Sequence, residues 1–157
     1  REVMIPMRDG VKLFTSIVIP KGAKDAPVIM TRTPYNAAGR TTRSRSMRML
    51  DTLPQGDEVF VADGYIRMFQ DVRGKYGSEG DYLMTRPLRG PLNPTPVDHS
   101  TDAYDTIEWL IKNLPESNGR VGMLGSSYEG FTVVMALVCR RSTPSGPACW
   151  PAPTATR

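Results

Sequence analysis

The sequence contains no long apolar run. No stretch reaches the about 18 residues that a membrane-spanning helix needs, or the about 7–15 of a signal-peptide core. We therefore predict no membrane partner. The first residue is Arg1 rather than Met, so we expect an incomplete N-terminus, and a periplasmic or a cytoplasmic location both stay open for the intact protein.

Cysteine and histidine are also scarce. The two cysteines, Cys139 and Cys149, have no CxxC spacing and no histidine nearby, and the chain has a single histidine, His99. Metal sites need several such ligands at short spacings. The sequence therefore predicts neither a metal nor another cofactor.

Aromatic residues are missing from the most basic segment. The net charge is only +4, and much of it comes from arginines interleaved with Ser and Thr: Arg40, Arg43, Arg45 and Arg48. Single-stranded nucleic acids bind where aromatic side chains stack on bases between positive charges. We interpret the segment as a solvated loop or helix face and predict no nucleic-acid partner.

The pattern of apolar residues predicts strands that alternate with helices. The overall composition, 39% hydrophobic and 23% charged, is that of one globular domain. Expected strands lie at 11–19, 27–31, 65–69 and 121–124, and expected helices at 57–64, 100–114 and 128–137. The 121–124 segment reads as a buried strand. This order predicts an α/β fold with a mostly parallel, doubly wound sheet.

A long loop precedes the best-defined helix. It runs over 71–96, is rich in Gly and Pro, and is expected to form a functional rim. Ser100 or Thr101 is the expected N-cap of the helix that follows. His99, at the helix entrance, is expected in a capping or surface role, with the role of a catalytic base as the alternative.

The sequence Gly125-Ser126-Ser127-Tyr128-Glu129-Gly130 stands between a predicted strand and a predicted helix. A nucleophilic serine on a strained strand-to-helix turn needs small flanking residues. The spacing departs from G-x-S-x-G by one residue. A dinucleotide fingerprint lacks its middle glycine and later acid, a P-loop lacks its Lys-Ser or Lys-Thr, and a Gly/Ser turn without chemistry stays open.

Several motifs, in order, resemble the CocE/NonD family of α/β-hydrolases, which includes cocaine esterase, the X-Pro dipeptidyl-peptidases and the α-amino-acid ester hydrolases. The residues of these motifs are most similar to those of the α-amino-acid ester hydrolases. The motifs are Met7-Arg8-Asp9-Gly10-Val11-Lys12-Leu13, Arg32-Thr33-Pro34-Tyr35, Gln70-Asp71-Val72-Arg73-Gly74, Gly77-Ser78-Glu79-Gly80, Asp102-Ala103-Tyr104-Asp105-Thr106-Ile107-Glu108-Trp109-Leu110 and the serine motif. The family's G-x-S-Y-x-G matches the unusual spacing.

The resemblance implies roles for three residues. Ser127 would attack the acyl carbon of a small ester or amide and form an acyl-enzyme. The backbone N–H of Tyr128 and the hydroxyl of Tyr35 would hold the oxyanion. The substrates implied are α-amino acid esters and β-lactam side chains, with X-Pro dipeptides or cocaine-like esters as the alternative; the substrate-binding residues stay unknown and the intact protein is open to homo-oligomerisation. Asp71 and Arg73 are expected to form a structural ion pair.

The base that a serine nucleophile needs is missing after Ser127. Glu129 is too close to reach around the site, and no histidine follows. We therefore expect an N-terminal fragment: a partial hydrolase domain over 1–137 and an aberrant, unstructured tail over 138–157, explained by a frameshift. Such a fragment would be inactive, and a non-catalytic truncated product is the alternative of another class.

Overall fold

The computed structural model describes residues 1–138. The expected tail falls almost wholly in 139–157, outside the described residues. The elements in chain order are β1 (Glu2–Pro6), β2 (Lys12–Val18), β3 (Ala26–Thr33), the 3-10 helix η1 (Ala38–Thr41), α1 (Met49–Thr52), α2 (Glu58–Ala62), β4 (Ile66–Asp71), α3 (His99–Asn113), β5 (Ser117–Met123) and α4 (Tyr128–Leu137).

The strands form one mixed sheet in the order β1-β2-β4-β3-β5. The pairings β4–β3 and β3–β5 are parallel, whereas β1–β2 and β2–β4 are antiparallel. The predicted α/β class is confirmed. The first antiparallel pair, β1–β2, is a hairpin whose turn ends at Gly10, with φ +85°.

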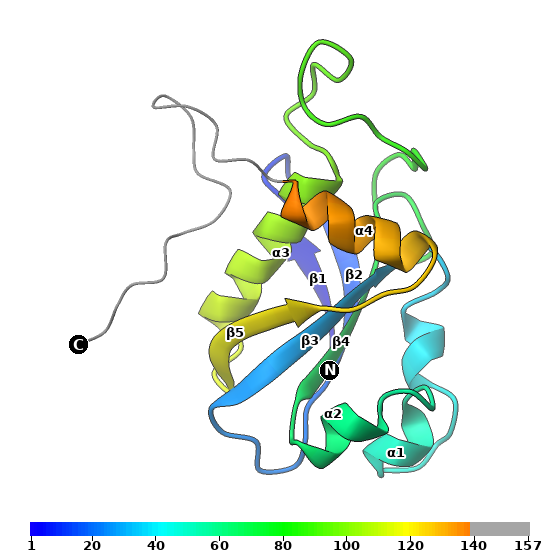
Figure 1. Cartoon of the computed structure of the whole chain (residues 1–157), viewed down its shortest axis with the longest axis vertical. Helices are drawn as coiled ribbons and strands as arrows, with labels where there is room; N and C mark the ends of the chain where they lie inside the picture. The colour runs from blue at the N-terminus through cyan, green and yellow to red at the C-terminus, as the bar shows by residue number, and fades with distance from the viewer. Residues whose placement is uncertain (139–157) are drawn as a thin grey trace, which may run out of the picture.

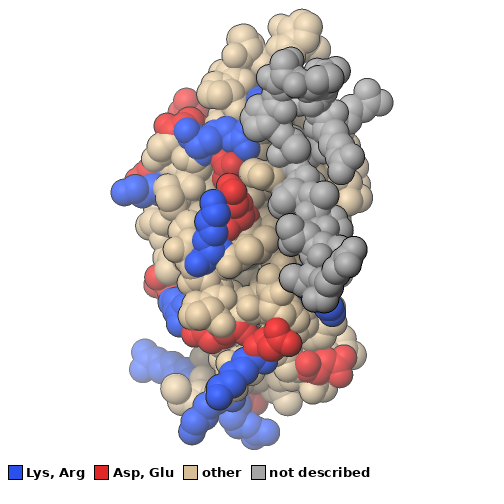
Figure 2. Space-filling model, turned by 90° about the vertical axis from the view of Figure 1, so that its left-hand side faces the viewer, with Lys and Arg blue, Asp and Glu red and all other residues tan. Residues whose placement is uncertain are grey.

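Helices cover both faces of the sheet (Figure 1). Along β4, Ile66 and Met68 pack with Leu110 of α3, while Phe69 points to the other face and packs with Leu53 near α1. Successive strand residues point to opposite faces, so one strand serves both cores. On the face shown in Figure 2, basic and acidic side chains lie beside one another. No helix within residues 1–138 has the length and hydropathy for crossing a membrane.

The N-cap of helix α3 lies two residues before Ser100, the earlier of the two predicted caps. Its N-cap is Asp98, whose carboxylate accepts hydrogen bonds from the N–H groups of Ser100 and Thr101, while the Thr101 hydroxyl accepts from the Asp98 N–H. This reciprocal pair is a capping box. The prediction of Ser100 or Thr101 as the cap is therefore wrong, because the carboxylate of Asp98, two residues before Ser100, accepts from both N–H groups.

The loop between β4 and α3 is held by Arg73. Its guanidinium bonds Asp102 of α3 at 2.7 Å and Asp9 of the β1–β2 turn at 2.8 Å. The expected Asp71–Arg73 ion pair does not form. The Asp71 carboxylate instead accepts hydrogen bonds from the backbone N–H groups of Ala37 at 2.7 Å and Gly77 at 3.2 Å.

Strand β5 is an edge strand of the described sheet. It pairs only with β3, and Val121 and Met123 are half-buried while Gly122 is exposed. The prediction of a fully buried strand at 121–124 is wrong, since no described strand covers its outer side. An apolar pocket of ≈ 410 Å³ lies there, lined by Ile107, Val121, Gly122, Met123, Val133, Ala136 and Leu137.

Candidate active site

Ser127 lies where β5 turns into α4. It is exposed and is the N-cap residue of α4, with φ 53° and ψ −125° and no capping hydrogen bond from its own side chain. A positive φ is costly for a residue with a Cβ and persists only where the surroundings impose it. The turn therefore presents a free hydroxyl at the start of a helix, as the motif predicts.

Two glycines make room for this turn. A Cβ on Gly125 would lie 2.4 Å from the carbonyl carbon of Glu129, and a Cβ on Gly130 would lie 3.2 Å from the Gly125 oxygen. The first distance is impossible and the second is very tight. The expectation that small residues must flank Ser127 is confirmed.

The helix start supplies N–H donors beside the serine. Tyr128 is the first residue of α4, and the first helix N–H that bonds back to Ser127 is that of Phe131, at 3.0 Å. The N–H groups of a first turn have no intrahelical acceptors and carry the positive end of the helix dipole. They are suited to a developing negative charge.

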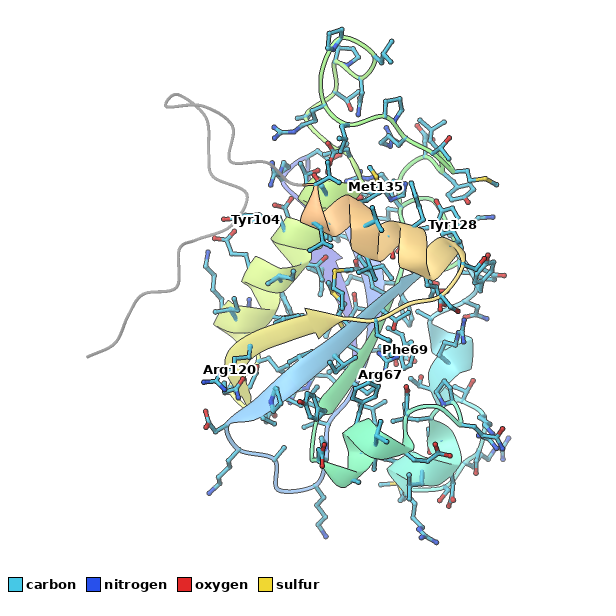
Figure 3. All side chains as sticks on the ribbon, viewed as in Figure 1. Arg67, Phe69, Tyr104, Arg120, Tyr128 and Met135 are labelled. Atoms are coloured by element: carbon cyan, nitrogen blue, oxygen red, sulfur yellow. The ribbon has the colours of Figure 1, made fainter. Side chains whose placement is uncertain are left out.

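The Tyr128 side chain joins α4 to the long loop. Its hydroxyl donates a hydrogen bond to the Met84 carbonyl at 2.5 Å, and Figure 3 shows it at the start of the helix. Its ring packs against His99 and Phe131 with centroid separations of 6.4 and 5.3 Å. Burial and a hydrogen bond with Tyr82 raise the pKa of the Tyr128 phenol.

Tyr35 lies just beyond the C-terminal end of β3, next to the strand that leads to Ser127. Tyr35 is 52% exposed, and its N–H donates a hydrogen bond to the Thr33 hydroxyl at 3.0 Å. Its phenol is near enough to Tyr128 to add to the rise in that residue's pKa. The structure thus brings Tyr35, Tyr128 and Ser127 to one edge of the sheet, where ligands bind in α/β proteins.

Asp71 reaches the same edge at the end of β4. Its two N–H donors belong to separate loops, since Ala37 follows Tyr35 and Gly77 belongs to the β4–α3 connection. Burial raises the pKa of the Asp71 carboxyl. Sequence reasoning missed this link, because a backbone partner leaves no trace in the choice of residue.

His99 is buried beneath the site rather than at the surface. Its ring is 5.4 Å from that of Phe131 and its Nε2 has no partner. Burial, with help from the Arg32 guanidinium, lowers its pKa from 6.5 to about 4. The expected surface or capping role is wrong. Within residues 1–138 no hydrogen bond joins Ser127 to a histidine or a carboxylate, so the alternative of a base gains no support.

A buried polar cluster around Arg32 hydrogen-bonds to the backbone of His99. Arg32 is fully buried, and its guanidinium donates to the Gln70 side chain at 2.9 Å and to the His99 carbonyl at 2.8 Å. Asp102 lies 3.6 Å from the same guanidinium. Arg32 and Gln70 belong to motifs that the sequence analysis singled out without giving them a role. Their pairing across β3 and β4 needed the sheet order.

No group of three or more potential metal ligands occurs in the described part of the chain. The site is made of hydroxyls and backbone N–H groups. Such a set can hold an acyl group and its oxyanion through hydrogen bonds.

Comparison with known proteins gives consistent matches. Residues 9–144 match the family described as X-Pro dipeptidyl-peptidase (S15 family). The cocaine esterase of Rhodococcus sp. (strain MB1 Bresler) is 35% identical over 87% of this chain and 20% of its own length. The chain thus spans about a fifth of that relative.

Two solved structures are more similar. An α-amino acid ester hydrolase labelled with selenomethionine is 76% identical, with TM-score 0.85 over 87% of this chain and 22% of its own. An aminopeptidase from the marine sediment archaeon Thaumarchaeota archaeon is 60% identical, with TM-score 0.83 over 86% and 22%. The resemblance stated from the motifs is confirmed. The chain belongs to the X-Pro dipeptidyl-peptidase (S15) family, a family of serine hydrolases.

Proposed function

We propose that the protein is an acyl-transferring hydrolase with Ser127 as its nucleophile. The observation that carries the proposal is the position of Ser127: exposed, at φ 53° in a turn that Gly125 makes room for, and placed at the start of α4. The Ser127 Oγ forms a bond to the acyl carbon, the alcohol or amine leaves with a proton, and water then releases the acid.

The oxyanion of this reaction would be held by two donors. The Tyr128 N–H has no helical acceptor, and the Tyr35 hydroxyl is exposed on the neighbouring loop. Removing one donor of this kind costs roughly 3–4 kcal/mol of transition-state stabilisation. Tyr35→Phe is therefore expected to lower kcat by about 100- to 1000-fold.

The base would come from outside the described residues. A serine at its ordinary pKa is a weak nucleophile, and α/β-hydrolases supply the acid and the histidine after the serine in chain order. His99 precedes Ser127, and its pKa of about 4 makes it a poor base at neutral pH. The 157-residue chain alone is therefore expected to be nearly inactive.

We propose substrates that carry a free α-amino group beside the acyl carbon. An α-amino acid ester and the substrate of an aminopeptidase share this group, and those are the substrates that the names of the two solved structures described above state. Esters of α-amino acids and β-lactams with an α-amino acyl side chain fit this description. N-acetylation should then abolish turnover of an otherwise good substrate.

A fluorophosphonate probe tests the nucleophile, because labelling needs an activated serine. A full-length protein that also contains the acid and histidine which the proposal places after Ser127 should be labelled, and mass spectrometry should place the label on Ser127. Ser127→Ala serves as the control and should remove both the label and hydrolysis of an α-amino acid ester. Labelling elsewhere, or activity that survives Ser127→Ala, would refute the proposal.

A further inference from the structure

The loop that carries Tyr35 is fastened at three points. Two of them connect it to the sheet: the Tyr35 N–H bonds Thr33 of β3, and the Ala37 N–H bonds Asp71 of β4. The third connects it to the helix behind the nucleophile. There, the Arg40 guanidinium bonds the Glu129 carboxylate at 2.6 Å.

Glu129 is a rigid partner in this contact. Its side chain is only 11% exposed, and its carbonyl accepts a hydrogen bond from the Thr132 hydroxyl at 2.7 Å. Its backbone lies against Gly125 so closely that not even a methyl group fits between them. Glu129 is two residues from Ser127, so its position is fixed relative to the nucleophile.

Arg40 is the only cation at ion-pair distance from Glu129 within residues 1–138. Arg67 is a second guanidinium in this region, but it forms an ion pair with Asp57 at 2.9 Å and a cation–π contact with the Phe69 ring. A poorly solvated carboxylate depends strongly on its one close partner. The Arg40 side chain is 34% exposed, so it can be changed with little effect on the core.

An acid in the first turn also stabilises a helix through the dipole. That role accounts for Glu129 on α4 but requires no arginine from another loop. The contact with Arg40 instead spans 89 residues of sequence and joins the two segments that carry Tyr35 and Ser127.

We infer that Glu129 is a positioning residue: through Arg40 it holds the Tyr35 loop at a fixed distance from Ser127, so that the Tyr35 hydroxyl meets the oxyanion. The inference rests on the proposed function, since it assigns Glu129 a part in the same site. Small displacements of a catalytic group are costly, and about 1 Å can cost about 100-fold in rate.

A double-mutant cycle in the protein as encoded tests this. Glu129→Gln keeps the shape and removes the charge, and it should lower kcat by roughly 10- to 100-fold with little change in KM. In a Tyr35→Phe background the same change should cost less than about 3-fold, because residues that act together are not additive. Arg40→Met should behave like Glu129→Gln. If the Glu129→Gln variant does not fold, Arg40→Met tests the same contact.

Arg45→Met is the matched control. Arg45 is exposed, belongs to the same basic segment and takes part in no ion pair among the described residues. The Arg45→Met substitution removes one positive charge, as Arg40→Met does, and should leave kcat unchanged. An equal loss from Glu129→Gln with and without the Tyr35 hydroxyl would overturn the inference.

Hydrogen–deuterium exchange gives a reading that does not depend on activity. Peptides covering 34–41 should exchange faster in Glu129→Gln and Arg40→Met than in Arg45→Met. Unchanged exchange would refute the inference even if Ser127 is the nucleophile. If activity survives Ser127→Ala, the proposed function fails on its own, and the exchange experiment still decides whether Glu129 holds the loop.

Discussion

His99 packs between the buried cluster at Arg32 and the rings of Tyr128 and Phe131. The charged groups nearest to it are the Arg32 guanidinium, which disfavours its protonation, and the Asp102 carboxylate, which favours it. Burial and the Arg32 charge together outweigh the Asp102 carboxylate, so the folded protein holds the imidazole neutral at pH values where an unfolded chain would protonate it.

This difference predicts a dependence of stability on pH. Between pH 6.5 and about pH 4 the unfolded chain binds a proton at His99 that the folded chain does not. The free energy of unfolding therefore falls as the pH falls through that window. From pH 7 to pH 5 the loss from this residue should be roughly 2 kcal/mol. Urea unfolding at both pH values measures it.

His99→Gln is the control, because it cannot titrate. Its loss of stability between pH 7 and pH 5 should be smaller than that of the wild type by about the same 2 kcal/mol. Equal losses in the two proteins would show that His99 is not the group that titrates.

At this scale, the sequence predicts what a residue type alone determines. Gly125 and Ser127 were identified because a strained turn leaves few choices of residue. Asp71 and Arg73 were paired wrongly because opposite charge two positions apart favours a pair, yet Arg73 points to Asp9 and Asp102. Partners from distant segments require the fold.

Among the elements, α3 depends most on a single residue. One Asp98 oxygen accepts from the N–H groups of Ser100 and Thr101, and the other accepts from the Arg89 N–H at 2.9 Å. The carboxylate thus caps the helix and also ends the long loop. Hydrogen bonding keeps the pKa of Asp98 below its ordinary value despite the burial.

Asp98→Ala should therefore destabilise the protein by about 2 kcal/mol or more, above the usual cost of losing an N-cap, because buried N–H groups would be left without acceptors. Asp98→Asn keeps an acceptor and should cost less. Asp63→Ala, an exposed acid at the end of α2, is the control and should change the unfolding free energy by less than about 0.5 kcal/mol.

Long periodic segments were the most predictable elements. The helix over 100–114 was expected from its apolar face and was found as His99–Asn113. Strand β1 was missed because Val3 and Ile5 offer too short an alternation to stand out. It becomes a strand through pairing with β2, a tertiary effect that local pattern does not contain.

Across the whole molecule, arginine pairs tie the sheet to its connections. Arg8 bonds Asp105 of α3 at 2.7 Å, and Arg73 links the hairpin turn to the same helix. The apolar core covers both faces of the sheet. On the outer side of β5, within the described residues, there is neither an arginine ion pair nor core packing. Leu137 of α4, which lines the apolar pocket beside β5, is 80% exposed.

We therefore predict that the 157-residue chain self-associates in a concentration-dependent way. Exposed strand edges and contiguous apolar surface promote pairing between chains. Leu137→Lys should reduce the association, as measured by sedimentation velocity. Leu92→Lys is the matched control: Leu92 is 85% exposed but lies on the long loop, away from β5, and its replacement should leave association unchanged. A monomer at all concentrations would contradict the prediction.

The architecture as a whole was predictable as α/β, since alternation of strands and helices is visible in the sequence. The order of the strands was not, because pairing partners are chosen by burial over the whole sheet. The strand order places β5 at the edge of the described sheet. The apolar residues of 121–124, taken alone, predicted a buried strand instead.

The close packing of Gly125 against Glu129 has an evolutionary consequence. On the mechanism we propose, replacing Ser127 by another small residue would end catalysis, whereas replacing Gly125 would break the turn itself. A lineage that loses the enzyme activity can therefore keep both glycines under selection for folding. Among descendants, the glycine pair marks inheritance of the scaffold, and only the serine between them records whether the chemistry was kept.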